Sequence, residues 1–255
     1  MRSSVWVAVV AALALASSAS PAFADQRDEF LAGRTNDCPN CDLTRVNRKR
    51  GDLTNANLAG ANLTEANFHD AKLMGANLTG AVLLGANLNK ADLRNAKLMG
   101  ADLTDAMLYA ARLTQADMSN ANLTKAIGRT ADLSRVKLVG ANLTQSDFRQ
   151  VRMPLADLSG AILVRAWLEE SQMRGVNLTG ADLTGAGLAL TDLNQANLTN
   201  ARVVDVDLRK ASIRGATATG TDFSRSVLRQ ADMTETTVER AVFTGTMMPD
   251  GTVLP

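Results

Sequence analysis

The apolar residues of this chain recur every five positions from Cys41 to Asp250. This stretch divides into forty-two units of five residues without an insertion or deletion. The first place of each unit is nearly always alanine or another small residue, and the third is nearly always leucine or another large apolar residue. A strict internal repeat of this kind predicts a solenoid of stacked units, in which each unit contacts only its neighbours.

Within one unit, the spacing of the apolar places predicts a very short strand followed by a corner. Places one and three are two residues apart, so in extended backbone both point to the same side, and the polar second place points away from it. Places four and five are rich in threonine, serine, glycine, asparagine and aspartate, which are typical of turns. Each unit should therefore turn its first and third residues inward, where stacked coils bury them.

Units such as ADLTG, ANLTG and ADLSG match the A-(D/N)-L-x-x signature of the pentapeptide-repeat family over about four-fifths of the chain. On this motif the chain resembles that family. The resemblance implies an all-β fold, a right-handed quadrilateral parallel β-helix with four units per coil and about ten coils from these forty-two units. Some cytoplasmic members of the family mimic DNA and block topoisomerases, so the resemblance also offers DNA mimicry as an alternative function.

The N-terminus departs from the repeat. Arg2, the apolar run 5–16 and the small residues that precede Asp25 follow the pattern of a secretory signal peptide over residues 1–24. The apolar run is too short for a membrane-spanning helix, which needs about 20 residues. We therefore expect an exported protein, periplasmic or secreted, without a membrane span.

Solenoids need caps, because a terminal coil exposes strand edges and apolar residues. Residues 25–40 should form the N-terminal cap, in which the segment DQRDEFL predicts a short amphipathic helix that lays Phe30 and Leu31 on the first coil. Residues 251–255 should form a C-terminal cap or tail. The terminal coils are also where copies of the chain could assemble into homo-oligomers.

The charge balance argues against a nucleic-acid partner. Loss of Arg2 with the signal peptide leaves 26 basic and 26 acidic side chains. A neutral chain lacks the basic excess of nucleic-acid-binding domains. It also lacks the acidic excess that DNA mimicry requires, and an export signal is out of place in an inhibitor of topoisomerases.

The only cysteines, Cys38 and Cys41, lie in the segment DCPNC. In an oxidising compartment a disulfide between them is the default, and we expect it to hold the first coil to the cap. A redox-active pair and free thiols are the alternatives, although the βαβ context of thioredoxin-like motifs is missing. Haem attachment would need histidine where Asp42 stands, and structural zinc would need about four ligands, so no cofactor or metal is expected.

No residues are predicted to form a catalytic site. His69 and Asp70 are neighbours at a corner, where both project outward, and no serine or cysteine nucleophile is distinguished by its context. The chain is therefore not expected to be an enzyme. A secreted enzyme of unknown class is kept as a further alternative.

A few residues break the repeat. Gly128 and Ala218 stand where leucine is expected, so the core there should narrow or contain a void. Pro154 stands at a corner, where its missing N–H is harmless only if that position is unpaired. Arg48 stands at a central place and suggests an irregular first coil.

With four units per coil, residues twenty apart share a column, and the units divide among four sides. One side, here called the Trp167 side, consists of the units that begin at residue 46 and at every twentieth residue to 246. Its outward places hold the aromatic, apolar and arginine residues that protein interfaces favour. The candidate partner-binding residues are Met107, Tyr109, Ile127, Arg129, Arg149, Trp167, Leu190, Arg209, Val227 and Arg229.

The alternative interpretation is that these residues are scattered by drift, which solvent-exposed places tolerate. The side whose units begin at 56 and at every twentieth residue to 236, here called the Gly-cornered side, is smoother and more polar. The sequence thus predicts a non-enzymatic, exported structural or interaction protein, a rigid rod that displays the Trp167 side to an unknown protein partner.

Overall fold

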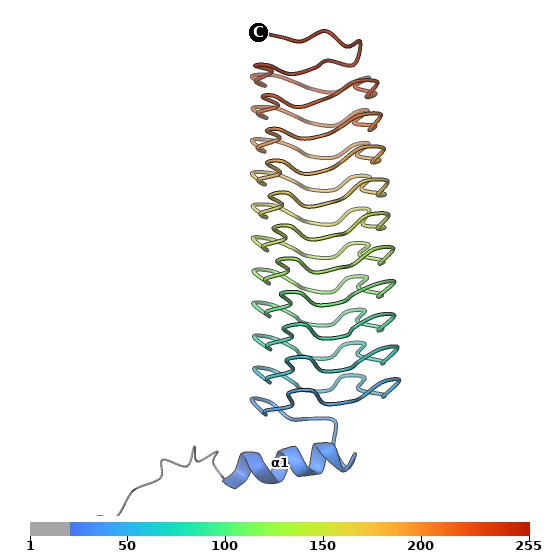
Figure 1. Ribbon diagram of the computed structural model, residues 1–255, viewed down its shortest axis with the longest axis vertical. Coiled ribbons are helices and arrows are strands. Elements are labelled where there is room, and N and C mark those ends of the chain that lie inside the picture. The colour runs from blue at the N-terminus through green and yellow to red at the C-terminus, as the bar shows by residue number, and fades with distance from the viewer. Residues whose placement is uncertain (1–20) are drawn as a thin grey trace, which may run out of the picture.

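The computed structural model describes residues 21–255 as one helix followed by a rod of stacked coils (Figure 1). The helix α1 spans Pro21–Leu31 and lies across the N-terminal end of the rod. Residues 1–20, which hold most of the predicted signal peptide, lie outside the described part. Because α1 begins at Pro21, it spans the predicted cleavage position before Asp25.

The rod is built from single-residue β-bridges at the second place of each unit. Parallel bridges join residues twenty apart, from Asp42 with Asn62 to Val227 with Met247, and within residues 21–255 no strand is longer. A twenty-residue spacing means that each coil holds four five-residue units. The observed ladder therefore places the units on four sides, in the predicted register.

Backbone hydrogen bonds connect every coil to its neighbours. The N–H of place two donates to the C=O of place one in the preceding coil, as from Asn62 to Cys41 at 2.9 Å. The N–H of place three donates to the following coil, as from Leu43 to Asn62 at 2.8 Å. The N–H of place one closes the corner, as from Ala56 to Leu53 at 3.0 Å.

Asparagine or aspartate at place two fastens the corner that follows it. The Oδ1 atom of Asn62 accepts hydrogen bonds from the Thr64 N–H at 3.1 Å and from the Thr64 hydroxyl at 2.7 Å. This local bonding explains why A-(D/N)-L-T recurs. It also explains Pro154, because place two of that unit is Arg152, which has no acceptor for an N–H at place four.

From Arg45 to Gly245, place five adopts a left-handed backbone whichever residue stands there. The φ angle is 64° at Gly100 and 53° at Ala110. A residue with a Cβ costs about 1–2 kcal/mol in this region, which explains the frequent glycine at the corners.

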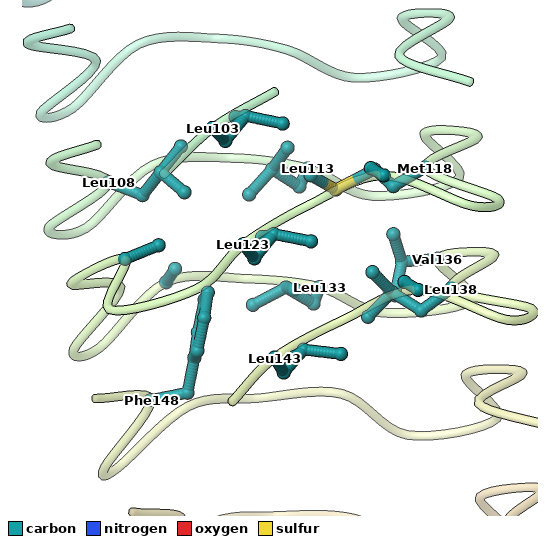
Figure 2. Close-up of a cluster of buried hydrophobic side chains, with 14 of the residues drawn as sticks. Leu103, Leu108, Leu113, Met118, Leu123, Leu133, Val136, Leu138, Leu143 and Phe148 are labelled. Atoms are coloured by element: carbon teal, nitrogen blue, oxygen red, sulfur yellow. The ribbon is translucent and has the colours of Figure 1, made fainter. Parts of the chain in front are cut away.

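Places one and three line the interior, as predicted. The residues of place three are buried from Leu53 to Leu228, whereas Val238 in the last coil is 38% exposed. Figure 2 shows Leu103, Leu123 and Leu143 stacked in a column. Each large apolar side chain that is fully buried contributes about 1.5–3 kcal/mol to folding. The stacked columns together replace the single core of a globular domain.

The prediction of a narrowed or empty core at Gly128 is wrong. Phe148 lies one coil later on the same side and points along the rod toward the preceding coil (Figure 2). A Cβ built on Gly128 would lie 2.1 Å from the Cε1 atom of Phe148. The aromatic ring therefore fills the space that the missing side chain leaves.

The N-terminal end differs from the prediction in two respects. Phe30 is buried, but Leu31 is 42% exposed, because adjacent residues of a helix point about 100° apart. Arg48 lies over the Phe30 ring, 4.5 Å from its centroid, and donates a hydrogen bond to the Phe30 carbonyl. The first coil is nevertheless regular, since Asn47 pairs with Asn67 in the usual way.

Cys38 and Cys41 are buried, and their Sγ atoms lie at disulfide distance, 1.98 Å. At the other end of the rod, the chain turns back on itself after Asp250. Val253 there forms an antiparallel bridge with Met247.

Candidate partner-binding face

The structure brings the predicted column of the Trp167 side together. Consecutive bridges join Met107 to Ile127, Ile127 to Asp147 and Asp147 to Trp167. The three apolar side chains are exposed by 37% at Met107, 44% at Ile127 and 49% at Trp167. The predicted outward orientation of this column is therefore correct.

The remaining predicted residues of the same side vary more in exposure. Tyr109, Leu190 and Arg229 at its corners are exposed, whereas Val227 at place two is only half-exposed. The geometry places all of them on one side of the rod. Their use by a partner stays a prediction.

A buried carboxylate organises the centre of this side. Asp147 is 4% exposed and accepts hydrogen bonds from the Nε of Arg129 at 2.7 Å and from the Nε and Nη2 of Arg149 at 2.9 and 2.8 Å. The two guanidinium groups neutralise a charge that would otherwise be costly to bury. These predicted interface arginines therefore hold the side together as well as facing solvent.

Arg209 is engaged in the same way. It donates three hydrogen bonds to the Asp207 carboxylate at 2.6–3.0 Å. These bonds keep the pKa of Asp207 below its ordinary value. Of the four predicted arginines, only Arg229 has no ion pair within residues 21–255.

Charged groups lie beside the indole of Trp167 and at the next residue of its column. The Arg149 guanidinium carbon lies 5.5 Å from the ring centroid. In the next coil Gly187 leaves space that the Glu169 carboxylate occupies, since a Cβ on Gly187 would lie 2.1 Å from Glu169 Oε1. The other carboxylate oxygen of Glu169 is buried without a hydrogen-bond partner in the described part of the chain.

A hollow that the sequence analysis missed lies beside this indole. It has a volume of about 590 Å³ and is lined by Lys125, Gln145, Arg165, Trp167 and Gly185. We call it the Trp167 hollow. Four of its residues stand at place five of the side that precedes the Trp167 side, twenty residues apart. Reading that corner together with place two of the next unit would have revealed it in the sequence.

A second hollow lies at the far corner of the Trp167 side. Its volume is about 340 Å³, and its lining consists of Ala189, Leu190, Arg209, Lys210, Arg229 and Gln230. Predicted interface residues thus line both hollows.

Within residues 21–255 no cluster of three or more histidine, cysteine, aspartate or glutamate side chains is arranged to hold a metal ion. The same part of the chain contains no helix with the length and apolar character needed to cross a membrane.

The sequence model of the pentapeptide repeats matches this chain in eight copies, over residues 41–80, 73–105, 111–150, 155–188, 177–215 and 207–245. The comparison with curated protein sequences gave no match.

Among solved structures, the chain is similar to HetL, a pentapeptide repeat protein involved in heterocyst differentiation regulation from the cyanobacterium Nostoc sp. strain PCC 7120. Identity is 27%, coverage is 89% of this chain and 97% of HetL, and the TM-score is 0.45. A pentapeptide repeat protein of the Arabidopsis thaliana thylakoid lumen is 28% identical over 48% of this chain and 68% of its own, with a TM-score of 0.24. QnrB1, a plasmid-mediated fluoroquinolone resistance protein, is 16% identical over 64% and 84%, with a TM-score of 0.40.

Proposed function

This chain belongs to the pentapeptide-repeat family, and we propose that it is a non-enzymatic, exported interaction protein whose rod presents the Trp167 side to a protein partner. The observation that carries the proposal is the exposed apolar column of Met107, Ile127 and Trp167, with Tyr109 at its corner. Aromatic residues and arginine are enriched among the residues that contribute most to protein binding.

The backbone supports this role because it is rigid. Hydrogen bonds join each coil to the next along the rod, so the spacing of the outward side chains is fixed before binding. Asp147 holds Arg149 by two hydrogen bonds, and Arg149 lies over the Trp167 indole. A preorganised surface loses less conformational entropy when a partner binds, which favours affinity.

Export, the handedness of the coils, the capping role of α1 and the non-enzymatic role belong to the same proposal. Export rests on the signal pattern of residues 1–24, and the proposed compartment is the periplasm or the exterior of the cell. The right-handed turn of the coils rests on the family. Buried Phe30 and its contacts with Arg48 support a capping role for α1. The non-enzymatic role rests on the family and on the repeat, which spreads polar side chains along flat sides instead of converging them.

The test is a pull-down from an envelope extract. We expect Trp167→Ala combined with Tyr109→Ala to abolish retention of the partner. Stability should be nearly unchanged, because substitutions of exposed residues usually shift it by only about 0.5 kcal/mol.

The control variant combines Lys137→Ala with Thr219→Ala, two outward substitutions on the Gly-cornered side, and should bind normally. A partner that is still retained after loss of Trp167 and Tyr109 would contradict the proposed face. Marked destabilisation by Trp167→Ala would show that the indole serves the fold instead.

A further inference from the structure

We infer that the Trp167 hollow receives a short acidic segment of the partner protein, with carboxylates at Lys125 and Arg165 and a neighbouring apolar side chain on the indole. This inference rests on the proposed function of the Trp167 side and names the chemistry of the partner. It draws on the charges in the hollow, on its aromatic wall and on its limited length.

The two cations of the hollow form no ion pair within residues 21–255. Lys125 and Arg165 both line it, and neither has an ion pair within residues 21–255, in contrast to Arg129 and Arg149 beside them. Gln145 lies between the two cations in the column and adds an amide donor. Their charge-assisted hydrogen bonds to carboxylates would be stronger than hydrogen bonds between neutral groups.

The wall of the hollow suits an apolar group next to these charges. Trp167 is 49% exposed, and Arg149 stacks over its ring, so the indole is held in place while part of it stays accessible. Gly185 lies at the end of the hollow and has no side chain to fill it. An acidic segment with one apolar residue therefore matches both parts of the lining.

The short length of the positively charged column limits the length of the ligand segment that it can contact. Lys125 and Arg165 stand two coils apart, about 10 Å at the usual strand spacing of about 4.8 Å, which about three extended residues can span. One coil before Lys125 the column holds Asp105, and one coil after Gly185 it holds Asp205, already paired with Arg225 at 2.7 Å. A nucleic acid would need several phosphate contacts along a longer basic track, so a short peptide segment fits better.

Trp167 provides a direct readout. The other tryptophan of the chain, Trp6, lies in the predicted signal peptide, so the tryptophan emission of residues 25–255 comes from Trp167 alone. The probe is a capped peptide, Glu-Glu-Leu-Glu-Glu. We expect a saturable change in Trp167 fluorescence that weakens as salt is added, and no change with Lys-Lys-Leu-Lys-Lys.

Lys125→Gln combined with Arg165→Gln should weaken the affinity for the acidic peptide by roughly tenfold or more. The matched control is Lys97→Gln with Arg240→Gln, which removes the same charge from the Gly-cornered side and should leave the affinity unchanged. Absence of a saturable response, or an equal loss in the control, would overturn the inference. Tighter binding of a short single-stranded DNA than of the peptide would overturn the choice of a protein segment.

The pull-down separates this inference from the proposed function. A partner whose retention needs Trp167 and Tyr109 but survives Lys125→Gln with Arg165→Gln would refute the acidic segment and leave the face standing. Peptide binding at the hollow, together with retention of the partner after loss of Trp167 and Tyr109, would refute the proposed function.

Discussion

At the residue scale, Gly128 and Phe148 behave as one packing unit shared between two coils. Gly128→Ala would place a methyl group 2.1, 2.5 and 2.9 Å from three carbons of the Phe148 ring. Because the buried ring has no free space to enter, we expect a destabilisation of about 1–3 kcal/mol, the usual cost of overpacking a core. Denaturant unfolding of the variant and the wild type measures this.

The partner substitution checks the mechanism. Phe148→Leu shortens the side chain that reaches Gly128, so the double variant Gly128→Ala with Phe148→Leu should lose less stability than the two single losses added together. Residues in contact typically show such coupling, whereas distant sites are additive. Additive losses would mean that the ring does not occupy the space at Gly128.

At the element scale, the five-residue unit determines what could be predicted from the sequence. The inward places follow from the repeat, because each place has one orientation. The four sides, and with them the exposed column with Trp167, follow from the resemblance to the pentapeptide-repeat family. The contact of Phe148 with Gly128 could not be predicted from the repeat, since it joins units of two coils and depends on the sizes of both side chains. The Trp167 hollow was missed because it combines residues of two sides, Arg165 from one corner and Trp167 from the next unit.

The N-terminal elements give a second prediction, which concerns the Cys38–Cys41 disulfide. The two cysteines are three residues apart, so the closed loop is short and its entropic contribution should be well below the roughly 3 kcal/mol of a 15-residue loop. We expect reduction to speed amide hydrogen exchange in α1 and in residues 41–60 and to leave later coils protected.

Two results would contradict this expectation. Complete unfolding on reduction would show that the disulfide stabilises the whole rod. Labelling of two free thiols in denatured, unreduced protein would show that the bond does not form.

At the scale of the whole molecule, every five residues of sequence advance the chain from one side of the rod to the next. Deleting residues 176–180 removes one unit between Trp167 and Leu190, so that every later unit moves to the adjacent side. Deleting residues 76–80, a unit of the same pattern, leaves all predicted partner-binding residues in register with one another. Both variants should fold, because a solenoid loses only the contribution of the missing repeat and its interface.

Binding should separate the two deletions. If the partner contacts the Trp167 side on both sides of the cut, the 176–180 deletion turns Leu190 and Arg229 away from Trp167 and should strongly weaken retention in the pull-down. The 76–80 deletion should bind like the wild type, and melting temperatures confirm that both variants fold. Equal binding by both would confine the partner to the coils before residue 176, where Lys125, Arg165 and Trp167 lie, because those residues keep their register in either variant.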